Sequence, residues 1–99
     1  MNAESWIQWS TDHLAETSLK LSIQGYSHHR IDSLNHTNPI FRAEFDRFQS
    51  RVDAAISDMT VNPDGYHHYD VMINASTDLL EFTNLHRAQF LGLNRDLAA

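Results

Sequence analysis

Hydrophobic residues recur every three or four positions between residues 39 and 60, which is the pattern of an amphipathic helix. Asn38 is a good N-cap residue, and Pro39 suits the first helical position, where its missing N–H is not needed. Residues 62–65 combine Pro, Asp and Gly, which are typical of a tight turn. We therefore predict a helix over 39–60. Its apolar stripe consists of Phe41, Phe45, Phe48, Val52, Ala55, Ile56 and Met59.

A second helical pattern follows this turn, from about residue 66 to residue 91. A connection this short makes the two helices antiparallel neighbours. Apolar positions cover roughly half of the second helix, against about a third for an ordinary surface helix. We therefore predict two neighbours for it, namely the 39–60 helix and either the N-terminal segment or a second copy of the chain. The two apolar stripes are Met72, Ala75, Leu79, Phe82, His86, Phe90, Leu93 and Leu97, and Tyr69, Ile73, Leu80 and Leu91.

The first 24 residues fit a helix better than a strand. Ser5 and Gln8 have the spacing of a capping box, which favours a helix start there. Residues 19–24 also alternate as in a strand, but no other segment offers a partner strand. A short helix is predicted between residues 27 and 36, with Ser27 as its N-cap. One face of the N-terminal helix contains Ile7, Leu14 and Leu21.

These elements predict an all-α fold: an antiparallel helical hairpin (about 39–60 and 66–91) with the N-terminal helix packed across it, as a three-helix bundle. The 99 residues suit a single helical domain, 1–99, and an apolar share of 41% supports a folded core. The chain has no cysteine, no signal-peptide pattern and no apolar run long enough to cross a bilayer. We therefore expect a cytoplasmic protein that does not enter membranes.

The functional signals are negative or weak. The sequence contains no phosphate-binding loop, nucleophile elbow or metalloprotease motif, so we predict no enzymatic activity, no catalytic residue and no cofactor. The net charge of −6 disfavours direct nucleic-acid binding and favours a protein partner with a basic surface. The resulting hypothesis is a small acidic inhibitor or adaptor that binds a larger complex, for example a phage-encoded inhibitor of a host nucleic-acid-handling defence system.

Aromatic and acidic residues are the candidates for binding such a partner. Trp6 and Trp9 lie off the Ile7 face, so they either pad the end of the bundle or form an exposed aromatic anchor. Acidic positions along the last helix are candidates for mimicking phosphates, and a homodimer through that helix is a further option. The predicted partner-binding residues are Trp6, Trp9, Tyr66, Tyr69, Asp70, Asp78 and Glu81.

Metal binding is an alternative function because the chain has seven histidines. In a helix, His28, Asp32 and His36 share one face, and His86 could approach that end of the bundle. A metal site needs three or four converging ligands, and the paired Glu-x-x-His pattern of di-iron bundles is absent, so we predict no metal residues. His86 itself is expected to be a core or interface histidine, or alternatively a pH-sensitive switch.

One local segment resembles a known family. Asp70-Val71-Met72-Ile73, with Leu80 and Phe82 beyond, resembles part of the C-terminal helix of the flagellar basal-body protein at the ring–rod junction. The resemblance covers about thirteen residues, and residues 89–91 and 95–97 differ from that family's Arg-Asn-Lys-Leu segment and Tyr-Gln-Glu ending. It implies a second alternative function, a self-assembling structural subunit of a rod or secretion apparatus.

Overall fold

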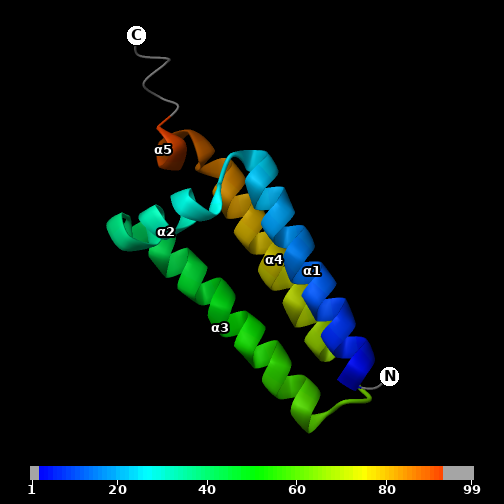
Figure 1. The fold of residues 1–99 in the computed structure, drawn as a ribbon. Helices are drawn as coiled ribbons and strands as arrows, with labels where there is room; N and C mark the ends of the chain where they lie inside the picture. Colours follow the sequence, from blue (N-terminus) through cyan, green and yellow to red (C-terminus); the bar gives the residue numbers. More distant parts are fainter. Residues whose placement is uncertain (1–2, 93–99) are drawn as a thin grey trace.

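The structure is a computed structural model that describes residues 3–92, and this part of the chain is all-α. Three long helices lie side by side, while a short one crosses one end and another short one continues the last long helix (Figure 1). The helical-bundle prediction is therefore confirmed. The helices are α1 (Ala3–Gln24), α2 (His28–Thr37), α3 (Pro39–Val61), α4 (His67–Leu85) and α5 (Arg87–Leu91).

Helices α3 and α4 form the predicted antiparallel hairpin and share the most extensive interface of the fold. Asn38 caps α3 as predicted, because its Oδ1 accepts hydrogen bonds from the N–H groups of Ile40 and Phe41 at 3.0 and 3.1 Å. Ala55 and Ala75 are fully buried, and their small side chains let the two helices approach closely. Beside them, the core contains Phe41, Phe48, Val52, Met72 and Leu79.

Helix α1 packs on the hairpin by running along α4, to which it is parallel. The direction is shown by successive contacts: Trp6 meets His68, His13 meets Ser76, and further along Gln24 meets Thr83. Residues Ala3–Gln24 are helical throughout, so the N-terminal segment is a helix and not a strand. Helix α1 is thus the second neighbour that the wide apolar face of α4 required. It begins by Ala3, so Ser5 lies inside the helix and the predicted capping-box start is wrong.

The face of α1 that packs on α4 differs from the predicted one. Of the predicted face, Leu21 is buried and Leu14 is partly buried, but Ile7 is 59% exposed, and Trp6 and Thr17 are buried instead. Trp6 carries a larger apolar surface than Ile7, which favours burial of Trp6 at the N-terminal end of α1. At that end, the Ile7 side of α1 faces away from the main α1–α4 contact.

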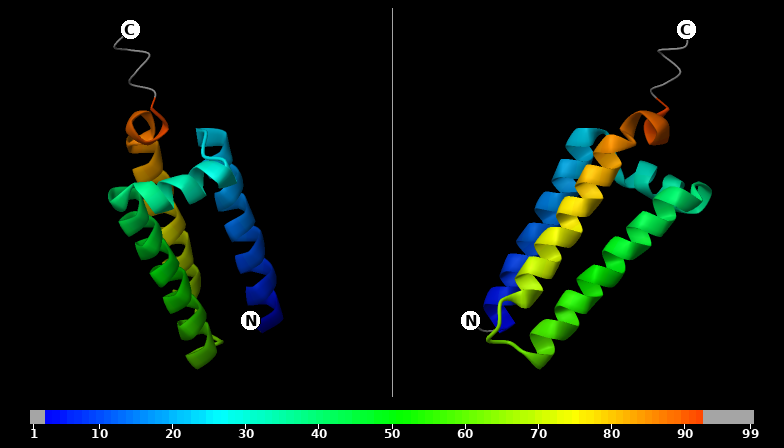
Figure 2. Two further views of the ribbon diagram at one scale, coloured as in Figure 1. Left: turned by 60° about the vertical axis from the view of Figure 1, so that its left-hand side comes forward. Right: turned by 180° about the vertical axis from the view of Figure 1, so that it is seen from behind.

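Helix α2 crosses the end of the bundle, between the top of α1 and the top of α3 (Figure 2). Ser27 is its N-cap as predicted, since Ser27 Oγ accepts a hydrogen bond from the Arg30 N–H at 3.1 Å. The predicted continuous helix over 66–91 breaks at His86, where φ is −101° and ψ is 17°. This break turns α5 so that Phe90 enters the core against Phe41.

Gly25 allows the chain to close this end of the molecule. Its φ is +112°, a conformation that side chains disfavour, and a Cβ there would lie 2.9 Å from Leu91 Cδ1. Leu93 and Leu97, which the pattern added to the apolar stripe of α4, lie outside the described residues. No helix within residues 3–92 combines the length and apolar character that crossing a membrane demands.

Candidate interaction surfaces

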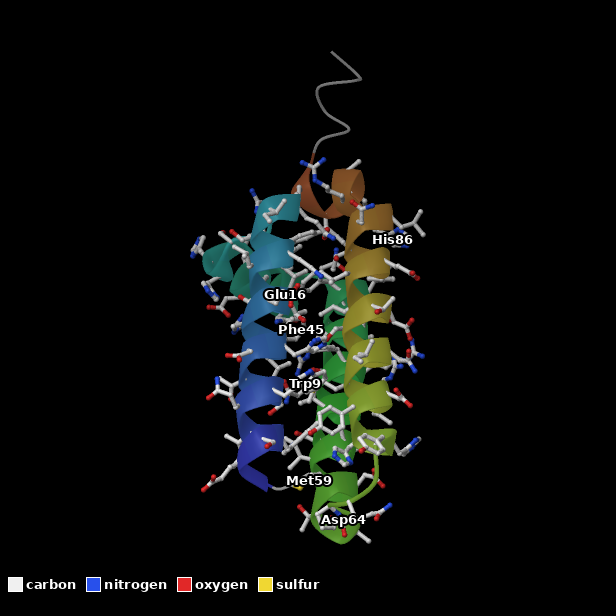
Figure 3. All side chains as sticks on the ribbon, turned by 90° about the vertical axis from the view of Figure 1, so that its right-hand side faces the viewer. Trp9, Glu16, Phe45, Met59, Asp64 and His86 are labelled. Carbon is white, nitrogen blue, oxygen red and sulfur yellow. The ribbon has the colours of Figure 1, made fainter. Side chains whose placement is uncertain are left out.

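Four of the predicted partner-binding residues are aromatic, and the structure gathers them at the hairpin-loop end of α1 and α4. The ring of Tyr69 lies between them, with centroids 5.2 Å from Trp6, 4.7 Å from Trp9 and 6.4 Å from Tyr66. Figure 3 shows Trp9 between α1 and α4. The sequence could not show this convergence because it depends on α1 being parallel to α4.

Of the two alternatives for Trp6, the exposed anchor is wrong and packing at the end of the bundle is correct, because its side chain is only 3% exposed; its assignment as a partner-binding residue fails with the anchor. The Trp6 ring stands edge-on to His68 and Tyr69 and stacks on Trp9. Trp9 and Tyr69 are partly buried in the same cluster, so of these aromatic residues Tyr66, 65% exposed, presents the most free surface. Trp6 therefore joins α1 to the hairpin.

The three predicted acidic residues of α4 have different environments. Asp70, in the first turn, and Glu81 are exposed, and neither has a lysine or arginine partner among the described residues. Asp78 instead accepts a 2.6 Å hydrogen bond from Arg51 of α3 within an ion pair. Asp78 is thus already used to join α3 to α4, and only Asp70 and Glu81 remain free for a partner.

The buried His68 was missed by the sequence analysis. Its Nδ1 lies 3.5 Å from Asp58 Oδ2, and neither atom makes a hydrogen bond of good geometry within the described part of the chain. His68 precedes Met72 by four residues, so the helical spacing of α4 could have placed it on the core face. It links α3, through Asp58, to α1, through the Trp6 ring.

The middle of the α1–α4 interface is polar, which the apolar pattern could not predict. The Nε2 atom of His13 lies 2.9 Å from Ser76 Oγ, and the Thr17 hydroxyl lies 3.1 Å from the same oxygen. The His13 ring also stacks on Trp9, with an interplanar angle of 8°. Burial lowers the pKa of His13 below its usual 6.5, although the nearby Glu16 carboxylate partly offsets this effect.

A second polar group closes the upper end of this interface. The Thr83 hydroxyl donates to Gln24 Oε1 at 2.7 Å, and Gln24 Nε2 donates to the Leu80 carbonyl at 3.1 Å. The Tyr26 hydroxyl donates to the Thr83 carbonyl at 2.7 Å, and Arg87 Nε donates to the Gln24 carbonyl. These contacts satisfy carbonyl groups in the last turns of α1 and α4. Burial raises the pKa of Tyr26 to about 12.

A groove lies between α1 and α3, which contact each other little because both pack on α4. We call it the α1–α3 groove. Its volume near α2 is about 310 Å³. Leu79 of α4 forms part of its floor, and Figure 3 shows Phe45 of α3 in the space between the long helices. The main lining residues are Leu14, Leu21, Ile31, Asp32, Asn35, Phe45 and Phe48, with His28 at the α2 end.

The candidate metal ligands do not converge. The ring of His36 bonds the backbone carbonyl of Asp32 at 2.7 Å instead of sharing a centre with its carboxylate. His86 is partly buried against the rings of Phe82 and Phe90, with centroids 4.7 and 5.8 Å away. Within residues 3–92, no three His, Asp or Glu side chains come close enough together to hold a metal ion.

Comparison of the chain with known protein families, curated proteins and solved structures finds no match. The resemblance to the flagellar rod-junction protein therefore rests on residues 70–82 alone. Any inference about function therefore rests on the aromatic cluster, the unpaired carboxylates and the α1–α3 groove.

Proposed function

We propose that the chain is a non-enzymatic, cytoplasmic protein-interaction module, a small acidic adaptor or inhibitor that binds a basic surface of a larger complex. The observation that carries the proposal is the distribution of ion pairs. Lys20, Arg42, Arg47 and Arg51 each pair with a carboxylate, and Arg87 bonds a backbone carbonyl. Of the six lysines and arginines within residues 3–92, this leaves Arg30 without such a partner.

Seven carboxylates in the described residues have no lysine, arginine or histidine within ion-pair distance. Their charge is open to a partner with lysine and arginine on its surface, and such steering accelerates association. The closest approach to a nucleophile with its base is His13 Nε2 and Ser76 Oγ at 2.9 Å, but Ser76 is 3% exposed and lies inside the α1–α4 interface, where a substrate has no access. The unpaired carboxylates are Glu4, Asp12, Asp32, Asp53, Asp64, Asp70 and Glu81.

Affinity capture with matched charge variants tests this proposal. The immobilised chain is exposed to lysate of its own host, and retained proteins are eluted with rising salt and quantified. The variant Asp70→Asn/Glu81→Gln removes two unpaired charges. The control Asp46→Asn/Glu44→Gln removes two charges that already pair with Arg42 and Arg47.

We expect a basic protein that elutes at raised salt and whose retention falls about tenfold in the first variant but less than about twofold in the control. Equal loss in both variants would show that net charge alone drives retention. Unchanged retention in both, or elution that does not depend on salt, would contradict the basic-partner proposal.

A further inference from the structure

Helical spacing extends both walls of the α1–α3 groove, beyond its lining residues, as a line of half-exposed apolar side chains. Ile7 precedes the lining residue Leu14 by seven positions and is 59% exposed. Ile56 follows the lining residue Phe45 by three helical turns and is 47% exposed. Helix α4 forms the floor and α2 closes one end. The groove therefore occupies the position that a fourth helix takes in a four-helix bundle.

We propose that the α1–α3 groove binds one amphipathic helix of the partner protein, with lysine or arginine beside the apolar ridge of that helix. This inference rests on the proposed function and adds to it the binding surface and the chemistry of the segment that is bound. The bound helix would cover Ile7 and Ile56 and would place its basic residues against the carboxylates that border the groove.

The α1 wall of the groove has the residue pattern that accepts a helix. Ile7, Leu14 and Leu21 repeat every seven residues, and the smaller Thr11 and Ser18 stand between them. Large and small residues thus alternate at spacings of three and four along one face of α1. This is the pattern of helix surfaces that pack side by side, where large side chains of one helix fit between those of its neighbour. From Ile7 to Leu21 this face is about 21 Å long, which corresponds to about four turns of the bound helix.

The charges around the groove define the flanks of that helix. Glu4 lies one turn before Ile7 on α1, and Asp53 lies one turn before Ile56 on α3. Asp32 lines the groove at its α2 end. None of these three carboxylates has a basic partner within the described residues. Beside Asp32, the buried Oδ1 of Asn35 has no hydrogen-bond donor. Lysine and arginine supply both the positive charge and the N–H donors that these groups lack.

The same charges disfavour a second copy of this chain as the occupant. Two copies meeting through their grooves would bring acidic borders together, since every lysine and arginine of the two wall helices, α1 and α3, is already paired with a carboxylate. Like charges placed opposite each other at an interface oppose association. A helix from a different, basic protein has no such conflict.

Binding of designed peptides tests the inference without knowledge of the natural partner. The probe is a monomeric peptide of about 21 residues, with leucine at the a and d positions of three heptads and lysine at e and g. A second peptide carries glutamate in place of lysine. Isothermal titration calorimetry measures both against the intact chain and four single variants, whose folding is checked by urea unfolding.

The variants form two matched pairs. Ile7→Gln and Ile56→Gln change the groove, while Leu19→Gln and Ile40→Gln change residues of similar exposure, 60% and 57%, on other faces of the same helices. We expect one lysine peptide per chain, binding that weakens about tenfold in the groove variants and less than about twofold in the controls. The glutamate peptide should bind at least about tenfold more weakly.

The outcomes separate this inference from the proposed function. Lysine-peptide binding that depends on salt but not on Ile7 or Ile56 would overturn the groove inference and leave the basic-partner proposal standing. Glutamate-peptide binding as tight as that of the lysine peptide would overturn the basic-partner proposal. Binding of neither peptide, or a groove already filled by a second copy in a dimer that Ile7→Gln dissociates, would overturn the groove inference.

Discussion

At the scale of single residues, α1 is held to the hairpin by a few side chains of unusual character for a core. Trp6 is fully enclosed by aromatic rings, and His13, Thr17 and Ser76 form a polar contact in the middle of the same interface. A buried polar group contributes to stability only while it keeps its hydrogen-bond partner, because an unpaired one has lost its contact with water without replacement. The attachment of α1 should therefore respond sharply to single substitutions and to pH.

Replacing Trp6 by alanine should destabilise the fold. Deleting a buried tryptophan typically costs about 3–5 kcal/mol, through lost burial and the cavity left behind. Tyr66, which is 65% exposed in the same aromatic cluster, is the matched control, and Tyr66→Ala should change stability by less than about 0.5 kcal/mol. Urea unfolding measures both, and a Trp6→Ala protein as stable as the parent would contradict the buried position of Trp6.

His13 should make the fold less stable in mild acid. Its folded-state pKa lies below the ordinary 6.5 because burial disfavours the charged ring. As the pH falls through about 6.5, the unfolded chain gains this proton before the folded chain does, so the stabilising contribution is full above that pH and is lost below it. The loss is complete once the pH falls below the folded-state pKa.

Urea unfolding at pH 7.5 and pH 5.0 checks this expectation. The difference in unfolding free energy between the two pH values should be smaller in His13→Gln than in the parent. Thr77→Gln, which places the same side chain at an exposed position of α4 and removes no titratable group, is the control and should leave the difference unchanged. Equal pH dependence in the parent and His13→Gln would show that His13 does not titrate as its buried environment requires.

At the scale of helices, the two interfaces of α4 differ in kind. Against α3 it packs apolar residues and alanines closely, while against α1 it presents Ser76 and Thr83. The α3–α4 hairpin and the cap at Asn38 were predictable because three local sequence features agree. These are the helical spacing of the apolar residues, the turn residues at 62–65 and the N-cap residue Asn38. The polar α1–α4 contact was not, because serine and threonine on a helix ordinarily indicate a solvent-exposed position.

The break at His86 has a similar explanation. The residues around it continue the helical spacing, so the sequence predicts one helix, and the tertiary packing of Phe90 against Phe41 determines the turn instead. The same holds for the N-terminal end of α1, where Trp6 is buried in place of Ile7. Both features depend on neighbours that are distant in the sequence.

Enlarging Ser76 should loosen α1 selectively. Ser76 is 3% exposed, so a leucine there would overpack the α1–α4 contact and remove the partner of His13, at a cost of about 1–3 kcal/mol. We expect faster amide hydrogen exchange in α1, with little change in the centre of α3. The control Asn74→Leu places the same side chain at an exposed position of α4. Equal acceleration in α1 and α3 would contradict a separately attached α1.

At the scale of the whole molecule, the α1–α3 groove separates two of the three long helices, and Asp32, a carboxylate without a basic partner among the described residues, lines it. The negative net charge follows from the composition, and the all-α fold class was predictable from the helical spacing of the apolar residues. The groove was not, because it results from α1 and α3 both packing on α4 and little on each other. Of the predicted binding residues, Tyr66, Asp70 and Glu81 remain exposed, while Trp6 and Asp78 have structural roles.

The most direct measurement of the central claim uses the six isoleucines of the chain as reporters. Their δ1-methyl groups are labelled with ¹³C, and methyl NMR spectra are recorded as the lysine-flanked peptide is added. Ile31 lines the α1–α3 groove, and Ile7 and Ile56 lie at helical spacings from its lining residues Leu14 and Phe45. The groove set is therefore Ile7, Ile31 and Ile56, and the outer set is Ile23, Ile40 and Ile73.

We predict that the groove set shifts together and saturates at one peptide per chain, while the outer set stays in place. No variant is needed, so a failure to fold cannot imitate this result. Shifts confined to Ile23, Ile40 and Ile73, or spread equally over all six methyl groups, would show that the peptide binds elsewhere and would contradict the groove as the binding surface.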